Sequence, residues 1–140
     1  MSHSFDALWI GCGDGRLRTG RNLEMEKMGL RLVDIPAPPG GALGLVFKEI
    51  DPHGETLRQA KIYAGLHNPS LIVLEAHLDC GAVKKILGRT FVNEEDEQNF
   101  LMQELQAAKS VMEKNLTGIP VKCILSKPVE GAFAYFSQAV

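Results

Sequence analysis

The chain has 140 residues, of which 45% are hydrophobic and 23% charged, and its formal net charge is −2. This length and composition suit one globular domain spanning residues 1–140, and the small charge excludes a general attraction to nucleic acid or to an anionic membrane. No apolar run approaches the roughly 20 residues of a membrane span, and the N-terminus lacks the pattern of a signal peptide. We therefore expect a cytoplasmic protein, whose three cysteines serve as thiols or metal ligands and not as disulfides.

Four short apolar runs, each bounded by turn residues, predict strands. The first, ALWIGC (7–12), leads into a glycine turn, and the second, LRLVDI (30–35), leads into the loop IPAPPGGALG. The third, SLIVLEAH (70–77), leads into LDCGA, and the fourth is IPVKCIL (119–125). Each strand therefore ends at a segment rich in glycine, proline or polar residues.

Helical patterns separate these runs. Residues 55–67 place apolar side chains at helical spacing, and so do residues 94–116. Asn93 is predicted as the N-cap of the second helix, and Glu94–Glu97 as its solvated first turn. Strands that alternate with helices predict a three-layer α/β fold, in which a mostly parallel sheet of about four to five strands carries helices on both faces.

Three metal-ligating side chains follow the ends of two predicted strands. Cys12 follows the first strand, while His77 and Cys80 close the third. Because ligands of open α/β sheets gather at the carboxyl edge of the strands, we expect these side chains to meet there. Two cysteines and one histidine form a zinc-ligand set that leaves one coordination position open, as catalytic zinc sites do.

Asp14 and Arg16 lie directly after Cys12, and only glycines separate these three residues. Asp14 is a possible fourth ligand of the metal, but Arg16 competes for its carboxylate as a bidentate partner. With Asp14 held by Arg16, a water would complete the zinc shell, and its pKa would fall to about 7. An alternative role for Asp14 is to cap the helix that follows.

The motifs CGDGR (12–16) and HLDCG (77–81) resemble those of the β-class carbonic anhydrases, and the resemblance covers residues 7–87. It implies that Cys12, His77 and Cys80 bind zinc, and that Asp14 and Arg16 form the catalytic dyad that controls the open position. The implied activity is that of a carbonate dehydratase, a lyase that reversibly hydrates carbon dioxide to bicarbonate through a zinc-bound hydroxide. The resemblance also implies a homodimer or a higher homo-oligomer.

The chain departs from this family at several points. Only eleven residues precede Cys12, so we expect the family's helical N-terminal arm to be absent. The loop after the second strand contains PAPPGGALG in place of a sequence such as RNAGG, and its Ala42, Leu43 and Val46 are candidates for an apolar wall of the site. Two alternatives follow: a zinc protein without catalysis, in which Asp14 closes the site, and a hydrolase of carbonyl sulfide or carbon disulfide.

A further alternative uses Cys12 with Arg18. The spacing Cys-x5-Arg after a first strand resembles the phosphate loop of tyrosine phosphatases and arsenate reductases, in which the cysteine attacks as a thiolate. Asp14 opposes this interpretation because it would place a carboxylate inside an anion cradle, and HLDCG would have no role. A Cys12–Cys80 disulfide would likewise leave His77, Asp14 and Arg16 unexplained. We expect Asp79 to be a turn residue and Cys123 to pack in the core.

Overall fold

The computed structural model describes residues 4–129 and the backbone of residues 135–139. Its centre is a five-stranded sheet with the strand order β2-β1-β3-β4-β5. The strands are β1 (Ala7–Ile10), β2 (Val33–Asp34), β3 (Ile72–His77), β4 (Val121–Pro128) and β5 (Tyr135–Ala139). The first four are mutually parallel and β5 is antiparallel to β4. The prediction of a mostly parallel sheet of four to five strands is confirmed.

The strands differ in extent from the predicted runs. All residues of β1 and β3 are buried, as expected for their mostly apolar sequences, but β1 already ends at Ile10. The run at 30–35 contributes only the two-residue strand β2, at the edge of the sheet. The strand β5 was not predicted.

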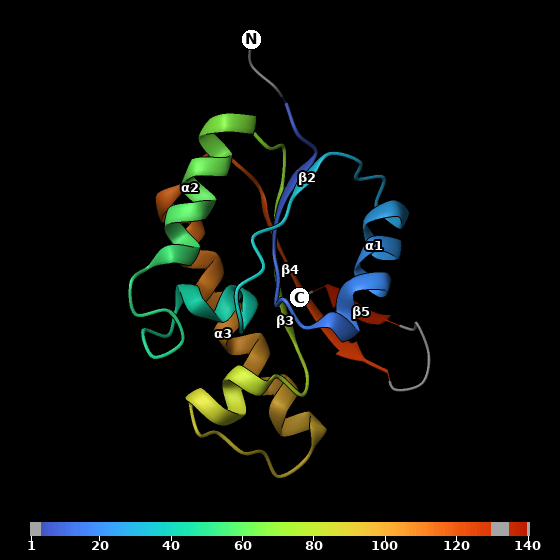
Figure 1. Cartoon of the computed structure of the whole chain (residues 1–140), viewed down its shortest axis with the longest axis vertical. Coiled ribbons are helices and arrows are strands. Elements are labelled where there is room, and N and C mark those ends of the chain that lie inside the picture. The colour runs from blue at the N-terminus through green and yellow to red at the C-terminus, as the bar shows by residue number, and fades with distance from the viewer. Residues whose placement is uncertain (1–3, 130–134, 140) are drawn as a thin grey trace.

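Three helices cover the two faces of the sheet (Figure 1). The helix α1 (Arg18–Lys27) lies on one face, and α2 (Glu55–His67) and α3 (Glu94–Asn115) lie on the other. A helix after Asp14 was considered only as a segment that Asp14 could cap, and no helical pattern predicted the bounds of α1, whose residues RTGRNLEMEK are mostly polar and include a glycine. The helices α2 and α3 confirm the two helical predictions.

Each sheet face has its own hydrophobic core, because side chains alternate along a strand. On the α2 and α3 face, the side chains of Leu8, Ile10 and Leu74 belong to a large cluster that also contains Leu101 and Leu105 of α3. On the α1 face the cluster is smaller, and its buried members are Trp9, Met25, Val73 and Ile124. The smaller core leaves room beside it for buried polar side chains.

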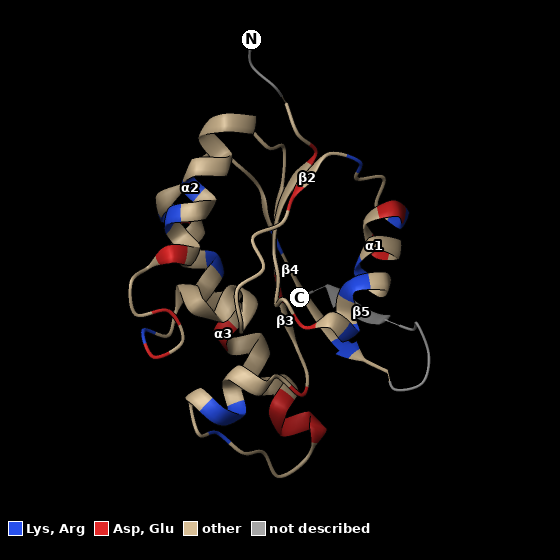
Figure 2. Ribbon diagram, viewed as in Figure 1, with Lys and Arg blue, Asp and Glu red and all other residues tan. Residues whose placement is uncertain are grey.

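The start of α3 is strongly acidic, and Figure 2 shows these residues as a red turn at one end of the helix. The Asn93 side chain accepts a hydrogen bond from the Asp96 amide at 2.9 Å, which confirms the predicted N-cap. Glu94 pairs with Lys127 of β4 at 2.7 Å. The first turn of α3 is thus not only a solvated group of charges, because the Glu94–Lys127 ion pair connects it to the sheet.

None of the helices in the described part of the chain has the length and apolar character needed to span a membrane.

Candidate metal centre

The parallel pairing of β1 with β3 brings two distant segments of the chain together. Ile10 pairs with Leu74, so both strands run in register toward the same edge of the sheet. Cys12 lies two residues beyond the end of β1, and His77 is the last residue of β3. Cys80 follows in the turn that leads into the π-helical segment η3 (Ala82–Ile86).

The two cysteine sulfurs and a ring nitrogen of His77 all lie within 4.8 Å of one another. The three residues are almost completely buried, with exposed fractions of 7%, 1% and 2% for Cys12, His77 and Cys80. The predicted convergence of these side chains is therefore present in the structure. Their spacing suits coordination of a single ion.

The backbone carbonyl of Leu78 orients the His77 ring. Nδ1 of His77 lies 2.7 Å from this oxygen, which only accepts, so Nδ1 carries the proton and donates it. The other ring nitrogen, Nε2, then has a free lone pair, and it is buried without a hydrogen-bond partner. A buried nitrogen of this kind is costly unless something binds it, and metal-ligating histidines are oriented in the same way.

The three groups share their protons unequally. The hydrogen bond from the Cys80 thiol, helped by His77, lowers the pKa of the Cys12 thiol despite burial. The neighbouring Cys12 sulfur, together with burial, raises the pKa of Cys80. Burial alone would lower the pKa of His77, but the Cys12 sulfur outweighs it and raises that pKa. Of the two thiols, Cys12 is therefore the one whose thiolate, the form that binds metal ions, is favoured.

The loop after β2 packs directly beneath the Cys12 turn. A Cβ atom at Gly13 would lie 2.7 Å from the carbonyl oxygen of Ala37, and one at Gly41 would lie 2.7 Å from the Cys12 nitrogen. Ala42 and Leu43, which follow in the 3-10 helix η2 (Gly41–Leu45), are buried in the same cluster as Cys12 and Cys80. The glycines thus let two backbone segments approach closely beside the site.

Asp14 is bound by Arg16. Arg16 Nη2 donates to Asp14 Oδ2 at 2.6 Å, and Arg16 Nε lies 3.1 Å from both carboxylate oxygens. The carboxylate also accepts the Arg16 amide at 2.9 Å, so Asp14 caps the short helix η1 (Gly15–Leu17) as well. These contacts with Arg16 lower the pKa of Asp14 to about 2. Asp14 is thus ionised and faces Arg16, and it lies outside the Cys–His–Cys group.

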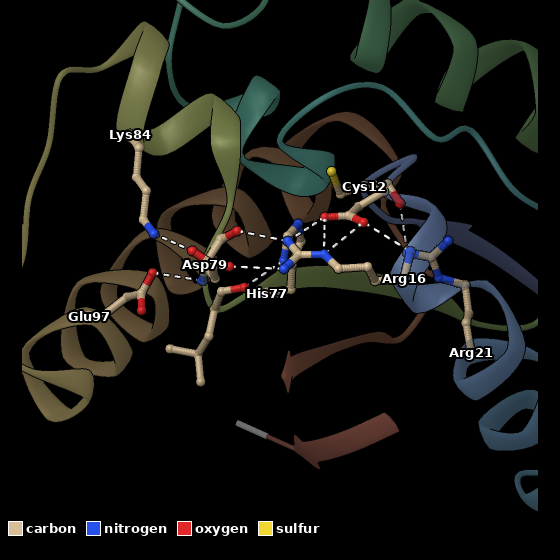
Figure 3. Close-up of polar contacts among 9 residues, drawn as sticks. Cys12, Arg16, Arg21, His77, Asp79, Lys84 and Glu97 are labelled. Atoms are coloured by element: carbon tan, nitrogen blue, oxygen red, sulfur yellow. Dashed lines mark hydrogen bonds and ion pairs between the residues drawn. The ribbon is translucent and has the colours of Figure 1, made fainter. Parts of the chain in front are cut away.

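Arg16 also joins the two motifs. Its guanidinium donates to Asp79 Oδ2 at 2.9 Å and to the Asp79 carbonyl at 3.0 Å (Figure 3). Asp79 has a φ of 59°, so it is the turn residue that we expected. Lys84 pairs with its carboxylate, and the first turn of α3 holds its backbone, since the Asp79 amide donates to Glu97 Oε2 at 2.9 Å. Lys84 and Arg16 together lower the pKa of Asp79.

Sequence reasoning missed the roles of four charged residues next to this site. Glu75, in the middle of β3, is 0% exposed and forms a buried ion pair with Arg21 of α1. One signal for it was available, namely a single glutamate inside the otherwise apolar run SLIVLEAH. No comparable signal marks Arg21, Lys84 or Glu97. Arg21 lies 54 residues from Glu75, and Glu97 lies 18 residues from Asp79, whereas Lys84 lies only five residues from Asp79.

The remaining candidates lie elsewhere. Arg18, the arginine of the Cys-x5-Arg spacing, is exposed, and it is Arg21 that contacts the Cys12 backbone. All three cysteines are free, so the disulfide interpretation is wrong. Cys123 is buried and its thiol lies 3.6 Å from the Leu105 carbonyl, as expected for a packing residue.

Known proteins share this arrangement of elements, although no family model matches the sequence. A tetrameric β-carbonic anhydrase from the fungus Sordaria macrospora superposes with a TM-score of 0.62 at 17% identity, over 99% of this chain and 84% of that one. The Coccomyxa β-carbonic anhydrase, solved with acetazolamide, gives 0.57 at 14% identity, over 99% and 75% of the two chains. The chain has the β-carbonic anhydrase fold.

The β-carbonic anhydrase fold is also that of a carbon disulfide hydrolase, which superposes with a TM-score of 0.52 at 12% identity, over 91% of this chain and 76% of that one. By sequence, the chain is 30% identical over 111 residues to an uncharacterized protein of Rickettsia bellii, covering 76% of this chain and 68% of that protein. The two proteins belong to one family. Within the β-carbonic anhydrase fold, the Cys12–His77–Cys80 group of this chain lies at the carboxyl edge of the sheet.

Proposed function

We propose that this protein is a zinc enzyme that reversibly hydrates carbon dioxide to bicarbonate. The observation that carries the proposal is the buried group of Cys12, His77 and Cys80, with Asp14 held beside it by Arg16. The β-carbonic anhydrase fold supports the same reaction class.

The residues present fit a zinc ion. Two sulfurs and one imidazole nitrogen are ligands that zinc prefers, and the unpartnered Nε2 of His77 supplies the nitrogen. Cys12 Sγ, His77 Nε2 and Cys80 Sγ would hold the ion. When bound, zinc supplies a Lewis acid that lowers the pKa of a water in its open position to about 7.

Asp14 and Arg16 control access to that open position. An ionised carboxylate two residues from Cys12 could itself bind zinc, so it must be held elsewhere for catalysis. Arg16 holds it by a bidentate pair, and Arg16 is in turn anchored by the Asp79 side chain and carbonyl. This arrangement opposes the alternative of a non-catalytic site closed by Asp14.

A second candidate reaction is hydrolysis of carbon disulfide or carbonyl sulfide. The likeness to a carbon disulfide hydrolase favours it, and these linear molecules would use the same zinc ligands. Comparison of turnover on carbon dioxide and carbonyl sulfide distinguishes the two activities.

The proposal is tested by stopped-flow hydration of carbon dioxide at mildly alkaline pH, with protein of measured zinc content. We expect one zinc per chain and rapid turnover that a chelator abolishes. Cys80→Ser should lose most of the zinc, whereas Cys123→Ala, which removes a buried thiol outside the group, should retain it. Arg16→Ala should retain zinc but lose activity. Absence of zinc from the parent protein would overturn the proposal, and full activity of Arg16→Ala would overturn the role of the dyad.

We also propose a homo-oligomer in the cytoplasm. The Sordaria macrospora enzyme of this fold is tetrameric, and a reducing compartment keeps the free thiols available for zinc. Sedimentation velocity on the zinc-loaded protein should therefore give a mass above that of one 15.3 kDa chain.

A further inference from the structure

A buried polar network lies on the α1 face of the sheet, directly behind the metal-ligating turn. Its centre is the Glu75 carboxylate, which is 0% exposed. Oε1 of Glu75 accepts from Trp9 Nε1 at 2.9 Å and from Arg21 Nε at 2.7 Å. Oε2 accepts from the Ser126 hydroxyl at 2.5 Å. Three elements, β1, α1 and β4, therefore donate to one side chain of β3.

The network reaches both segments that carry the ligands. Arg21 Nη2 donates to the carbonyl oxygen of Cys12 at 2.8 Å (Figure 3). Because Arg21 Nε donates to Glu75, the guanidinium bridges Glu75 to the peptide that carries the first ligand. On the other side, Ser126 pairs with His77 across the sheet, and its carbonyl accepts the Leu78 amide at 2.9 Å. The Leu78 carbonyl, in turn, orients the His77 ring.

The glycine turn is shaped around this ion pair. A Cβ atom at Gly11 would lie 2.6 Å from Glu75 Oε1 and 2.7 Å from Arg21 Nη2. The residue before Cys12 thus has no room for a side chain as long as Arg21 occupies its position.

We propose that Arg21 and Glu75 are positioning residues of the metal centre, which hold the Cys12 peptide, and with it the Cys12 sulfur, where His77 and Cys80 can share one ion. The inference rests on the zinc site proposed above. The forked guanidinium is essential to it, since one end binds Glu75 and the other binds the Cys12 carbonyl. Partners in the outer shell of a metal site typically change metal affinity about 10- to 100-fold.

A purely structural role for the pair makes a different prediction. Removal of one partner of a buried ion pair leaves an uncompensated charge and destabilises the protein, whereas replacement of both partners by neutral groups is often tolerated. In Arg21→Met with Glu75→Gln, the glutamine retains an oxygen for Trp9, but nothing donates to the Cys12 carbonyl. The double variant therefore separates stability from metal affinity.

The experiment measures zinc affinity by chelator competition, the absorption bands of the cobalt(II)-substituted protein, and the urea midpoint of the metal-free protein. We expect the double variant to unfold near the parent midpoint but to bind zinc about 10- to 100-fold more weakly, with altered cobalt bands. Arg21→Lys retains the charge but not the fork, so it should show the same loss of affinity and serves as the test if the double variant does not fold. Arg18→Met, at an exposed arginine of the same helix, is the control and should match the parent.

Two results would overturn the inference. If the double variant or Arg21→Lys binds zinc as tightly as the parent and has the same cobalt spectrum, the network is structural only, and the zinc site stands. If the parent binds neither zinc nor cobalt, the proposed function falls first and the positioning role falls with it.

Discussion

The glycines of the turn after β1 serve different purposes. Gly11 leaves space for the Arg21–Glu75 pair, and Gly13 allows the loop after β2 to approach, whereas a Cβ at Gly15 would meet no atom within 4 Å. Asp14, between the last two, has two roles at once, because it both caps η1 and receives the Arg16 guanidinium. In this turn, Gly11 and Gly13 are thus required by close packing, whereas Asp14 is required for its contacts with Arg16.

This difference predicts opposite effects of two alanine substitutions. Gly11→Ala forces a methyl group against two buried charged atoms and should destabilise the protein by about 1–3 kcal/mol, the usual cost of overpacking. Gly15→Ala meets no obstacle and should be neutral or stabilise by up to about 1 kcal/mol, since it restricts the unfolded chain. Urea unfolding of the two variants measures both effects, and equal losses would contradict this account of the turn.

At the scale of elements, side chains hold the starts of α2 and α3 in different ways. Asn93 caps α3 directly. The start of α2 follows Gly54, which has no side chain, and Asp51 supplies the cap from outside the helix. Its two carboxylate oxygens accept the amides of Glu55 at 3.0 Å and Thr56 at 2.8 Å. The start of α2 is thus held by the Asp51 carboxylate.

The cap of α2 should depend on pH. Burial opposes ionisation of Asp51, but the Thr56 and Glu55 amides outweigh it and lower the pKa of its carboxyl. A carboxyl whose pKa is depressed in the folded state contributes its full stability above its unfolded pKa of about 3.9, and loses it as the pH falls through the folded value. Asp51→Ala should therefore cost about 1 kcal/mol at neutral pH, and the difference should shrink below about pH 4. Urea titrations of both proteins from pH 7 downward test this, and a constant difference would contradict it.

At the scale of the whole molecule, an ion in the candidate metal centre would connect the segments at the ends of β1 and β3, which the sheet places close together but does not link. Cys12 follows β1, His77 ends β3 and Cys80 follows it, so one ion would link two strands whose residues contribute to both hydrophobic cores. Binding to the native state alone stabilises it by mass action, since the unfolded chain does not hold the three ligands together.

Zinc should therefore raise the melting temperature. Free zinc at about 100 times its Kd adds about 2.7 kcal/mol, which corresponds to roughly 5–10 °C for a chain of this size. Differential scanning calorimetry with zinc and with a chelator measures the shift. Cys80→Ser should show almost no response to zinc, and an equal shift in this variant would mean that zinc binds elsewhere.

The order of β1 to β4 with α2 and α3, and the convergence of Cys12, His77 and Cys80, were predictable from the sequence, because both rest on local patterns. Apolar runs determine the strands, and the rule that parallel strands end at one edge brings their final residues together. Only the tertiary structure decided the second partner of Arg16, Asp79, which lies 63 residues away, and the partner of Arg21, Glu75, which lies 54 residues away. Such contacts depend on the register of the strands and on how α1 packs against the sheet. Because α1 is mostly polar and has no apolar periodicity, its sequence predicts neither its packing nor its contacts.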